Sequence, residues 1–330
     1  MSPTLYAGTV GASVWQSDDL GETWDRPFFS GLYFECRVFS LTAQPAHGAA
    51  VVAGTDQGIW RWLPDARRWE KLADAPGGRI IWSIAQSPHD PMVLLAGSTP
   101  AALFRSEDGG VGWSDAGVKF PEECEAVDRT RVTQILFDPI DPALVWATVE
   151  IAGVFRSHDS GRTWVKRVEG LTSEDMHGIA VVRRNGRRRL LAATNKGLHI
   201  SDDDGDHWTF RDVEPAMRTM LTPGEAWQYT RAVTAKPDGS GAIFLTNGDG
   251  PPGSTGRLLR SEDQGETWSA VSLPVDLNST LWCVAVSRAD PQLVFCCTAY
   301  GQLFRSRDGG ATWSKLRREL GEIRALLAVD

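Results

Sequence analysis

The stretch that decides the fold reads Ser157-His158-Asp159-Ser160-Gly161-Arg162-Thr163-Trp164, one copy of the pattern S-x-D-x-G-x-[ST]-W. Complete copies also occupy residues 17–24, 261–268 and 306–313. Copies with one change occupy residues 106–113 and 201–208, and a decayed copy at residues 62–69 keeps only its final tryptophan. Successive terminal tryptophans lie 45, 44, 51, 44, 60 and 45 residues apart. A period near 45 residues predicts an array of one supersecondary unit.

The repeated phrase predicts a self-contained turn. An aspartate in a hairpin loop accepts hydrogen bonds from backbone N–H groups just ahead of it, and serine does so more weakly. The glycine supplies a positive φ at little steric cost, and the tryptophan covers the loop with an apolar ring. We therefore expect a structural role, and no acid–base role, for six aspartates: Asp19, Asp108, Asp159, Asp203, Asp263 and Asp308.

Each period has the composition of four short strands. In the best example, β-rich runs bounded by Pro, Gly and Asp are expected at residues 131–137, 143–150, 153–157 and 163–167. Four antiparallel strands per unit, repeated seven times, predict an all-β, seven-bladed β-propeller that forms a single domain over residues 1–330.

The two termini are expected to complete one blade together. Residues 5–9 and 13–16 match a second and a third strand, so the first blade lacks its first strand. Residues 323–329 match a first strand and are left over at the other terminus. Pairing them would close the propeller without an open sheet edge.

Composition limits the functional classes. Apolar residues make up 42% of the chain, charged residues 23%, and the net charge is −8. This acidic balance argues against a nucleic-acid partner, and no apolar run reaches the length of a membrane span. The N-terminus runs into a strand pattern without a leader, which predicts a cytoplasmic protein. Five cysteines without paired spacing predict reduced thiols.

Three segments are longer than the minimal repeat: residues 115–130, 209–228 and 247–257. All three are expected on the face opposite the repeated turns, and elaborated loops on a rigid scaffold are common binding sites. The first strands begin on that face, around the mouth of the expected central channel. Candidate ligand-binding residues there are Arg37, Arg131, Trp227, Arg231, Trp282 and Arg324. Guanidinium groups suit a carboxylate or phosphate, and the alternative is that acidic neighbours neutralise them.

Catalytic candidates near the same mouth are Glu35, Glu150, Asp175, His177, Tyr229 and Asp249. A glycosidase would need two of the carboxylates facing each other across a sugar. His177 has no second His or Cys at ligand spacing, so neither a metal nor a cofactor is predicted. His199 occupies a position that is phenylalanine in other repeats and is expected to be a packing residue.

An arginine run at residues 183–189 has Asn-Gly at its centre, which predicts a hairpin tip. The hairpin is expected on the same face as the repeated turns. It is interpreted as a solvated turn, with an anion site as the alternative.

The eight-residue phrase resembles the Asp-box, also known as the bacterial neuraminidase repeat. Families that share it include sialidases, xyloglucan-cleaving glycosidases, sortilin-type receptors and photosystem II assembly factors. The resemblance implies a propeller, but these families range from hydrolases to binding scaffolds. A sialidase has six blades and a Phe-Arg-Ile-Pro motif that does not precede Ser17. The xyloglucanase type pairs two propellers, and the single seven-bladed form is most similar to the assembly-factor group and its bacterial relatives.

The sequence therefore favours an Asp-box propeller that binds a small anionic ligand, a glycan or a protein partner at the channel mouth. The alternative is a hydrolase or lyase, glycosidase-like, that acts on a sugar or another small anionic substrate at the same mouth. The residues do not decide between the two functions.

Overall fold

A computed structural model describes residues 2–27, 30–44, 50–74, 78–121, 123–124, 128–184, 186–213 and 229–330, the side chains of residues 123 and 124 excepted. The chain forms two compact units. The first unit contains residues up to Lys166 together with Arg324–Asp330, and the second contains Arg167–Ile323. No helix in the described part of the chain has the length and apolar character needed to cross a membrane.

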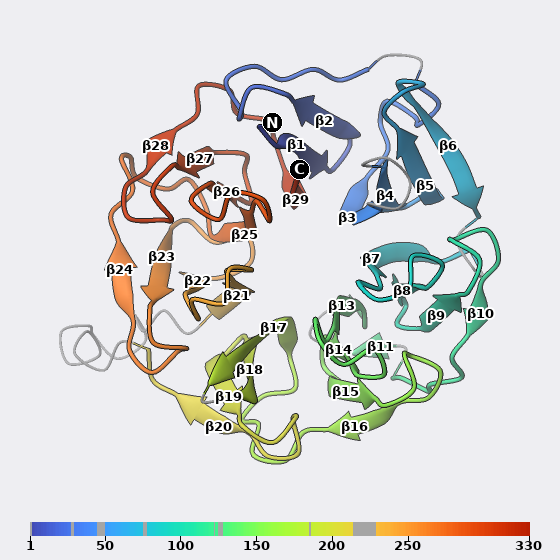
Figure 1. The fold of residues 1–330 in the computed structure, drawn as a ribbon, viewed down its shortest axis with the longest axis vertical. Coiled ribbons are helices and arrows are strands. Elements are labelled where there is room, and N and C mark those ends of the chain that lie inside the picture. Colours follow the sequence, from blue (N-terminus) through green and yellow to red (C-terminus); the bar gives the residue numbers. More distant parts are fainter. Residues whose placement is uncertain are drawn as a thin grey trace. The chain divides into compact units, whose positions relative to one another are not determined.

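The first unit holds four antiparallel sheets, labelled in Figure 1. One sheet joins β2 (Val14–Ser17), β1 (Thr4–Thr9) and β29 (Ile323–Val329). The next contains β3 (Val38–Gln44), β4 (Ala50–Thr55), β5 (Gly58–Leu63) and β6 (Arg68–Ala73). The third contains β7 (Ile80–Gln86), β8 (Leu94–Thr99), β9 (Leu103–Ser106) and β10 (Ser114–Asp115). The fourth contains β13 (Val132–Phe137), β14 (Val145–Val149), β15 (Gly153–Ser157) and β16 (Val165–Arg167). A separate hairpin pairs β11 (Glu123–Cys124) with β12 (Asp128–Arg129).

The second unit holds three antiparallel sheets. One contains β17 (Met176–Arg184), β18 (Arg187–Thr194), β19 (Gly197–Ser201) and β20 (Thr209–Arg211). The next contains β21 (Tyr229–Ala235), β22 (Ile243–Gly248), β23 (Gly256–Ser261) and β24 (Ser269–Val271). The last contains β25 (Leu281–Val286), β26 (Val294–Thr298), β27 (Leu303–Ser306) and β28 (Ser314–Lys315).

Seven sheets of this kind confirm the predicted all-β, seven-bladed propeller. The predicted partnership of the termini is also confirmed, because β29 is the neighbour of β1. In that sheet an isolated bridge between Gln16 and Asp25 takes the place of a fourth strand. Where the eight-residue phrase has decayed, a tight turn closed by the Arg67 N–H and the Pro64 carbonyl joins β5 to β6.

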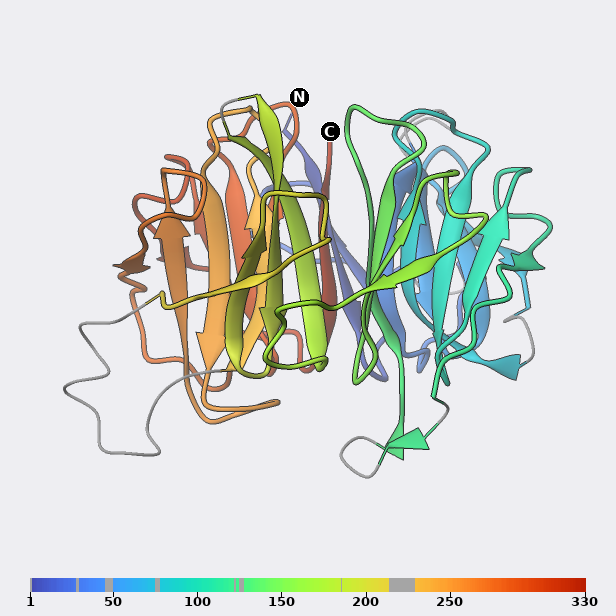
Figure 2. The same cartoon turned by 90° about the horizontal axis from the view of Figure 1, so that it is seen from below.

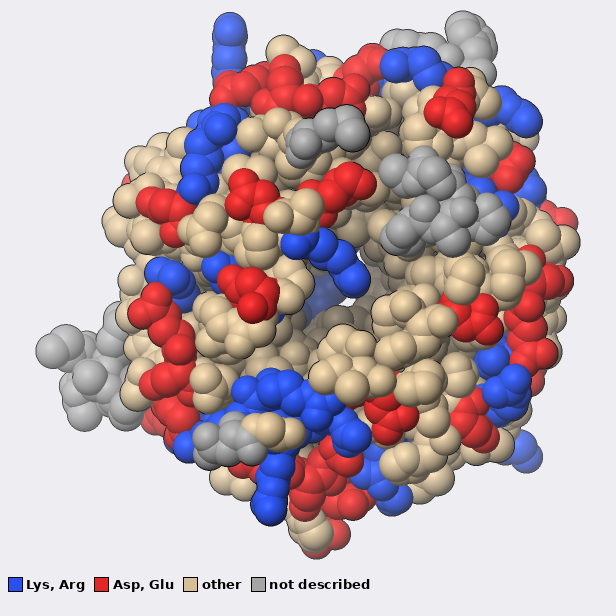
Figure 3. All heavy atoms as spheres, in the orientation of Figure 1, with Lys and Arg blue, Asp and Glu red and all other residues tan. Residues whose placement is uncertain are grey.

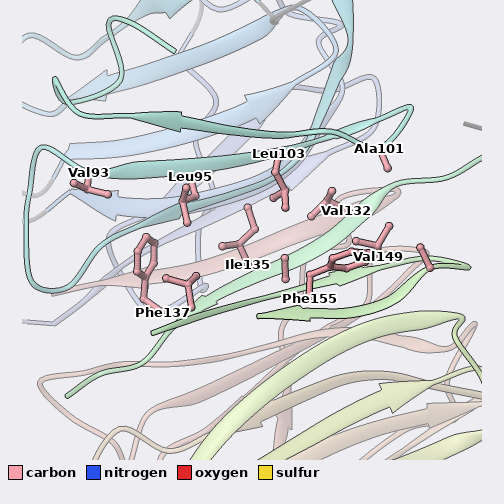
Figure 4. Close-up of a cluster of buried hydrophobic side chains, with 12 residues drawn as sticks. Val93, Leu95, Ala101, Leu103, Val132, Ile135, Phe137, Val149 and Phe155 are labelled. Carbon is pink, nitrogen blue, oxygen red and sulfur yellow. The ribbon is translucent and has the colours of Figure 1, made fainter. Parts of the chain in front are cut away.

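Neighbouring sheets within a unit share apolar cores. Between β8–β9 and β13–β15, Leu95, Leu103, Val132 and Phe155 pack against one another with almost no exposure (Figure 4). Strands β9 and β14 are buried at every position. Close packing on both sides makes the sheets rigid supports for the loops at their ends.

The six Asp-boxes have one shared geometry. The serine Oγ donates to the aspartate at 2.7 to 2.8 Å, and the glycine N–H donates to the serine. The residue before the box glycine has a positive φ in every copy, from 58° at Gln264 to 78° at Gly109. The tryptophan Nε1 donates to the glycine carbonyl in five copies, whereas Trp208 donates to the Arg167 carbonyl. The boxes are structural turns, as predicted.

Candidate ligand-binding site

Each sheet has two ends that differ in structure. We call the end at which the first strand begins the start end, and the opposite end, which carries the Asp-box, the box end. The turn between the second and third strands also lies at the start end, because the strands alternate in direction. The described part of segment 115–130 and the loop between β22 and β23 therefore lie at the start ends of their sheets, as predicted. Most of segment 209–228 is outside the described residues.

A β-bulge occupies the same place in six of the seven sheets. Near its beginning the first strand places two residues opposite one residue of the second strand. The first residue of each bulge is Phe39, Trp82, Thr133, His177, Arg231 or Trp282. Bulges re-aim side chains and are frequent beside binding sites. Here they lie near the start end of each first strand.

In the second unit the bulges bring three strands together around His177. Its Nδ1 lies 2.7 Å from the Thr230 carbonyl oxygen, which only accepts, so Nδ1 carries the hydrogen. Its ring lies 4.5 Å from the Tyr229 ring, and Nε2 is 3.3 Å from the Asp175 carboxylate. Arg231 donates to the His177 carbonyl at 3.0 Å and covers the Trp282 ring at 4.0 Å. The structure thus gathers five of the predicted residues into one cluster.

The environment of Asp175 differs from that of its counterparts in the first unit. In two sheets of the first unit, an arginine precedes the first strand and an acid follows the second strand. Arg37 Nε lies 2.9 Å from Asp56, whose backbone N–H donates to the Arg37 carbonyl. Arg131 and Glu150 repeat both the ion pair and the backbone bond.

The same backbone bond in the second unit joins the Asn195 N–H to the Asp175 carbonyl at 3.2 Å. Here the residue before the first strand is an acid, Asp175, where the first unit has an arginine. The residue after the second strand is an amide, Asn195, where the first unit has an acid. The Asn195 side chain accepts a hydrogen bond from Ser173 at 2.7 Å. Asp175 consequently faces an imidazole where its counterparts Arg37 and Arg131 face carboxylates. The pair is nearly buried, with side-chain exposures of 15% for Asp175 and 4% for His177.

The first unit has an aromatic stack at its start ends. Phe39 and Trp82 stack at 4.6 Å with an interplanar angle of 22°, and the Arg131 guanidinium lies 4.5 Å from the Trp82 ring. Arg37 and Arg131 are both paired with carboxylates, which is the alternative that the sequence left open for these arginines. Glu150 accordingly serves as the charge partner of Arg131.

The remaining candidates are dispersed. Glu35 is exposed in the segment before β3, and Arg324 lies on β29. Asp249 holds its own loop: its carboxylate accepts from the Ser254 N–H at 2.9 Å, the Ser254 hydroxyl at 2.5 Å and the Thr255 N–H at 3.2 Å. Burial opposes ionisation, but these bonds outweigh it and lower the Asp249 pKa. Trp227 is outside the described residues.

Two further predictions from the sequence are confirmed. His199 is fully buried, with its ring edge-on to Phe210 at 5.6 Å and Nε2 3.0 Å from the Thr172 hydroxyl. Burial lowers the His199 pKa to about 4, so it is a neutral packing residue at ordinary pH. The four cysteines with described side chains, Cys36, Cys283, Cys296 and Cys297, are free thiols.

The sequence reading missed Thr230, Asn195, Phe39 and Trp82. A signal for the bulged residues was present, because large aliphatic residues at the start of two of these strands are three residues apart instead of two. Examples are Ile81 with Ile84, and Met176 with Ile179. Spacing of three breaks the alternation of a regular strand and indicates one extra residue.

Comparison with known proteins gives one family match and several relatives. The BNR/Asp-box repeat model matches residues 304–315. The chain is 24% identical over 241 residues to a probable oligoxyloglucan-reducing end-specific xyloglucanase of Neosartorya fischeri. That alignment covers 65% of this chain but only 29% of the relative. A xyloglucanase of Paenibacillus is 24% identical over 252 residues, which cover 67% of this chain and 24% of the relative. The chain thus spans less than a third of these relatives' length.

Solved structures share the fold at low identity. The GH74 xyloglucanase of Xanthomonas campestris aligns with a TM-score of 0.69 and 18% identity, over 99% of this chain and 52% of that one. YCF48 from Cyanidioschyzon merolae aligns with a TM-score of 0.58 and 16% identity, over 87% of each chain. The chain is therefore an Asp-box propeller with neighbours among both GH74 enzymes and YCF48.

Proposed function

We propose that this chain binds a glycan at the start ends of β17, β21 and β25. The observation that carries the proposal is the Asp175–His177 pair. This pair lies at the start of its first strand, where two sheets of the first unit have arginine–carboxylate pairs. The Tyr229 ring lies beside His177. A carboxylate and an imidazole are suited to exchanging hydrogen bonds with sugar hydroxyl groups.

The charges favour a neutral glycan over an anionic ligand. Arg231 is committed to the His177 carbonyl and the Trp282 ring, and Arg37 and Arg131 are paired with carboxylates. Asp175 adds a carboxylate that would repel an anion placed beside it. The sequence relatives named as xyloglucanases support a neutral glycan as the ligand class.

Hydrolysis is the second candidate function, because the sequence relatives are glycosidases by name. Acid–base cleavage of a glycosidic bond needs two carboxylates with different roles. In the described part of the second unit, Asp175 and Asp249 are the predicted carboxylates, and Asp249 is engaged in its own loop. We therefore propose binding first, and an assay of reducing ends tests for hydrolysis. A protein ligand is the further alternative, since YCF48 has been solved bound to D1 peptide.

Titration calorimetry with xyloglucan oligosaccharides tests the proposal. Asp175→Asn and His177→Gln should each weaken binding about tenfold, because loss of one good hydrogen bond is worth roughly 1.4 kcal/mol. Glu262→Gln, an exposed carboxylate at the box end, is the matched control and should bind like wild type. Thermal unfolding of all variants establishes that they fold.

The same samples separate the two candidate functions. Release of new reducing ends by wild type, abolished in Asp175→Asn, would replace the binding proposal with hydrolysis. If the wild-type protein binds none of the oligosaccharides, or if both site variants bind like the control, the glycan site is wrong.

A further inference from the structure

Two cysteines occupy directly opposite positions in the sheet of β25–β28. The register of the sheet pairs Cys283 of β25 with Cys297 of β26. This sheet, coloured orange to red, lies beside the sheet of β21–β24 in Figures 1 and 2. Opposite residues of antiparallel strands have Cα atoms about 4.5 or 5.5 Å apart, and a disulfide spans Cα separations of about 4.4 to 6.8 Å. The backbone therefore holds the two residues at a distance that a disulfide bridges.

The side chains of this pair also point to the same face of the sheet. Cys296 packs with Phe244 and Val284 in the core that the two neighbouring sheets share. Because successive residues of a strand alternate between its faces, Cys283 and Cys297 point to the opposite face. There the two thiols meet in a hydrogen bond. Cys296 points away from the pair, so it is a natural internal control.

The two thiols differ in their access to solvent. Cys283 is half-buried, whereas Cys297 is fully buried. Figure 3 shows Lys, Arg, Asp and Glu side chains at the surface of one face, whereas Cys297 lies on a strand that is buried at every position. Burial, and next the hydrogen bond with Cys283, hold the pKa of the Cys297 thiol well above its usual range. Burial disfavours a charged thiolate, but an uncharged disulfide has no such penalty.

We propose that Cys283 and Cys297 are a modification site that a small disulfide, of the class of oxidised glutathione, converts to a protein disulfide. The more accessible Cys283 attacks one sulfur of the oxidant, which forms a mixed disulfide and releases one thiol. Cys297 then attacks the Cys283 sulfur, which closes the protein disulfide and releases the second thiol. In each step the attacking sulfur gives up its proton to the thiolate that leaves. Two protein thiols are oxidised, and the small disulfide is reduced to two thiols.

The disulfide would tie the bulged start of β25 to β26. It closes a loop of 297 − 283 = 14 residues, and a covalent loop restricts the unfolded chain and so stabilises the fold. Trp282, which precedes Cys283, is the first residue of the bulge, and its ring lies 4.0 Å from the Arg231 guanidinium. Oxidation would therefore fix the strand that carries Trp282. The proposal is independent of the glycan site.

Incubation of the folded protein with oxidised glutathione, followed by peptide mapping, tests the site. Trypsin cleaves after Arg288, between the two cysteines, so the disulfide joins peptides 261–288 and 289–305. Mass spectrometry without reductant should show the joined peptides, two hydrogen atoms lighter than the sum of the separate ones. The oxidised protein should also unfold about 5 °C above the reduced protein. A reductant should reverse both changes.

Two matched variants separate the pair from its neighbour. Cys297→Ala and Cys296→Ala each remove one fully buried thiol from the same strand. Cys296→Ala should still give the joined peptides, whereas Cys297→Ala should stop at the mixed disulfide on Cys283. Thermal unfolding of the reduced variants establishes that they fold, and the mapping of wild type decides the proposal if they do not.

Three results would overturn the proposal. One is that folded wild type stays reduced, or stops at the mixed disulfide, in an excess of oxidised glutathione. Another is that the joined peptides form only when the protein is oxidised in denaturant, which would show that the fold does not bring the two thiols into reacting position. The third is loss of the joined peptides in Cys296→Ala but not in Cys297→Ala, which would assign the bond to Cys296.

Discussion

Asp308 shows why the recurring aspartates stabilise turns. Its carboxylate accepts the Thr312 hydroxyl at 2.6 Å, the Thr312 N–H at 2.8 Å and the Ser306 hydroxyl at 2.7 Å. The bond from the Thr312 hydroxyl is the largest of the effects that lower the Asp308 pKa to about 2. Because the folded-state pKa lies below the usual value near 4, the ionised carboxylate stabilises the fold above that value. The contribution is lost as pH falls through about 2.

We expect Thr312→Ala to raise the Asp308 pKa toward its ordinary value. The variant should be less stable than wild type at neutral pH, and the difference should shrink below about pH 4, where the unfolded-state carboxyl is protonated. NMR titration of the carboxyl carbon and denaturant unfolding at several pH values measure the two effects. Ser314→Ala is the control, because that hydroxyl donates to the Arg305 carbonyl and not to Asp308. An unchanged Asp308 pKa would show that the bond from the Thr312 hydroxyl does not lower it.

At the scale of the element, basic side chains connect neighbouring sheets through the Asp-boxes. Arg105 of β9 donates to the Ser160 carbonyl of the next box at 2.9 Å. Arg61 reaches the Gly109 carbonyl in the same way, and Arg189 reaches that of Gln264 at 3.3 Å. Each accepting residue has a positive φ, so the unusual turn conformation directs a carbonyl toward the preceding sheet. The box therefore joins sheets as well as closing its own hairpin.

Replacing Arg105 by Met should destabilise the first unit by about 2 kcal/mol, because a buried charged donor is lost and the Ser160 carbonyl loses a partner. Denaturant unfolding measures the change. Arg162→Met removes an exposed arginine that, like Arg105, contacts Glu107, and it should cost less than about 0.5 kcal/mol. Equal losses of unfolding free energy in the two variants would mean that the hydrogen bond from Arg105 to the Ser160 carbonyl does not stabilise the unit.

The contrast between boxes and bulges explains what the sequence could predict. A box is local: Ser157, Asp159, Gly161 and Trp164 bond to one another within eight residues, so the motif alone specified its geometry. The site depends on register between strands far apart in the chain. The bond from His177 to the Thr230 carbonyl spans 53 residues, and strand composition does not encode it. Candidate residues were therefore predicted by position, whereas their partners were not.

At the scale of the whole molecule, the chain begins and ends in the same sheet. β29 follows the second unit in sequence but is the neighbour of β1 in the first. Leu327 and Val329 pack in a core with Tyr6 and Val38, and a Cβ added at Gly8 would clash with Val38. Without β29, strand β1 would expose an unpaired edge and an apolar face, which favours aggregation.

Deleting residues 322–330 should therefore destabilise the protein by several kcal/mol, on the order of the loss from removing two or more buried apolar side chains. Thermal unfolding measures the loss, and removal of Asp330 alone is the control, since it leaves β29 intact. Because the shortened chain could fail to fold for other reasons, a synthetic peptide of residues 321–330 is added during refolding. The natural peptide should restore the thermal unfolding transition of the shortened chain, and a peptide carrying Leu327→Asp should not. A shortened chain that unfolds at the wild-type temperature would show that the terminal strand does not complete the sheet.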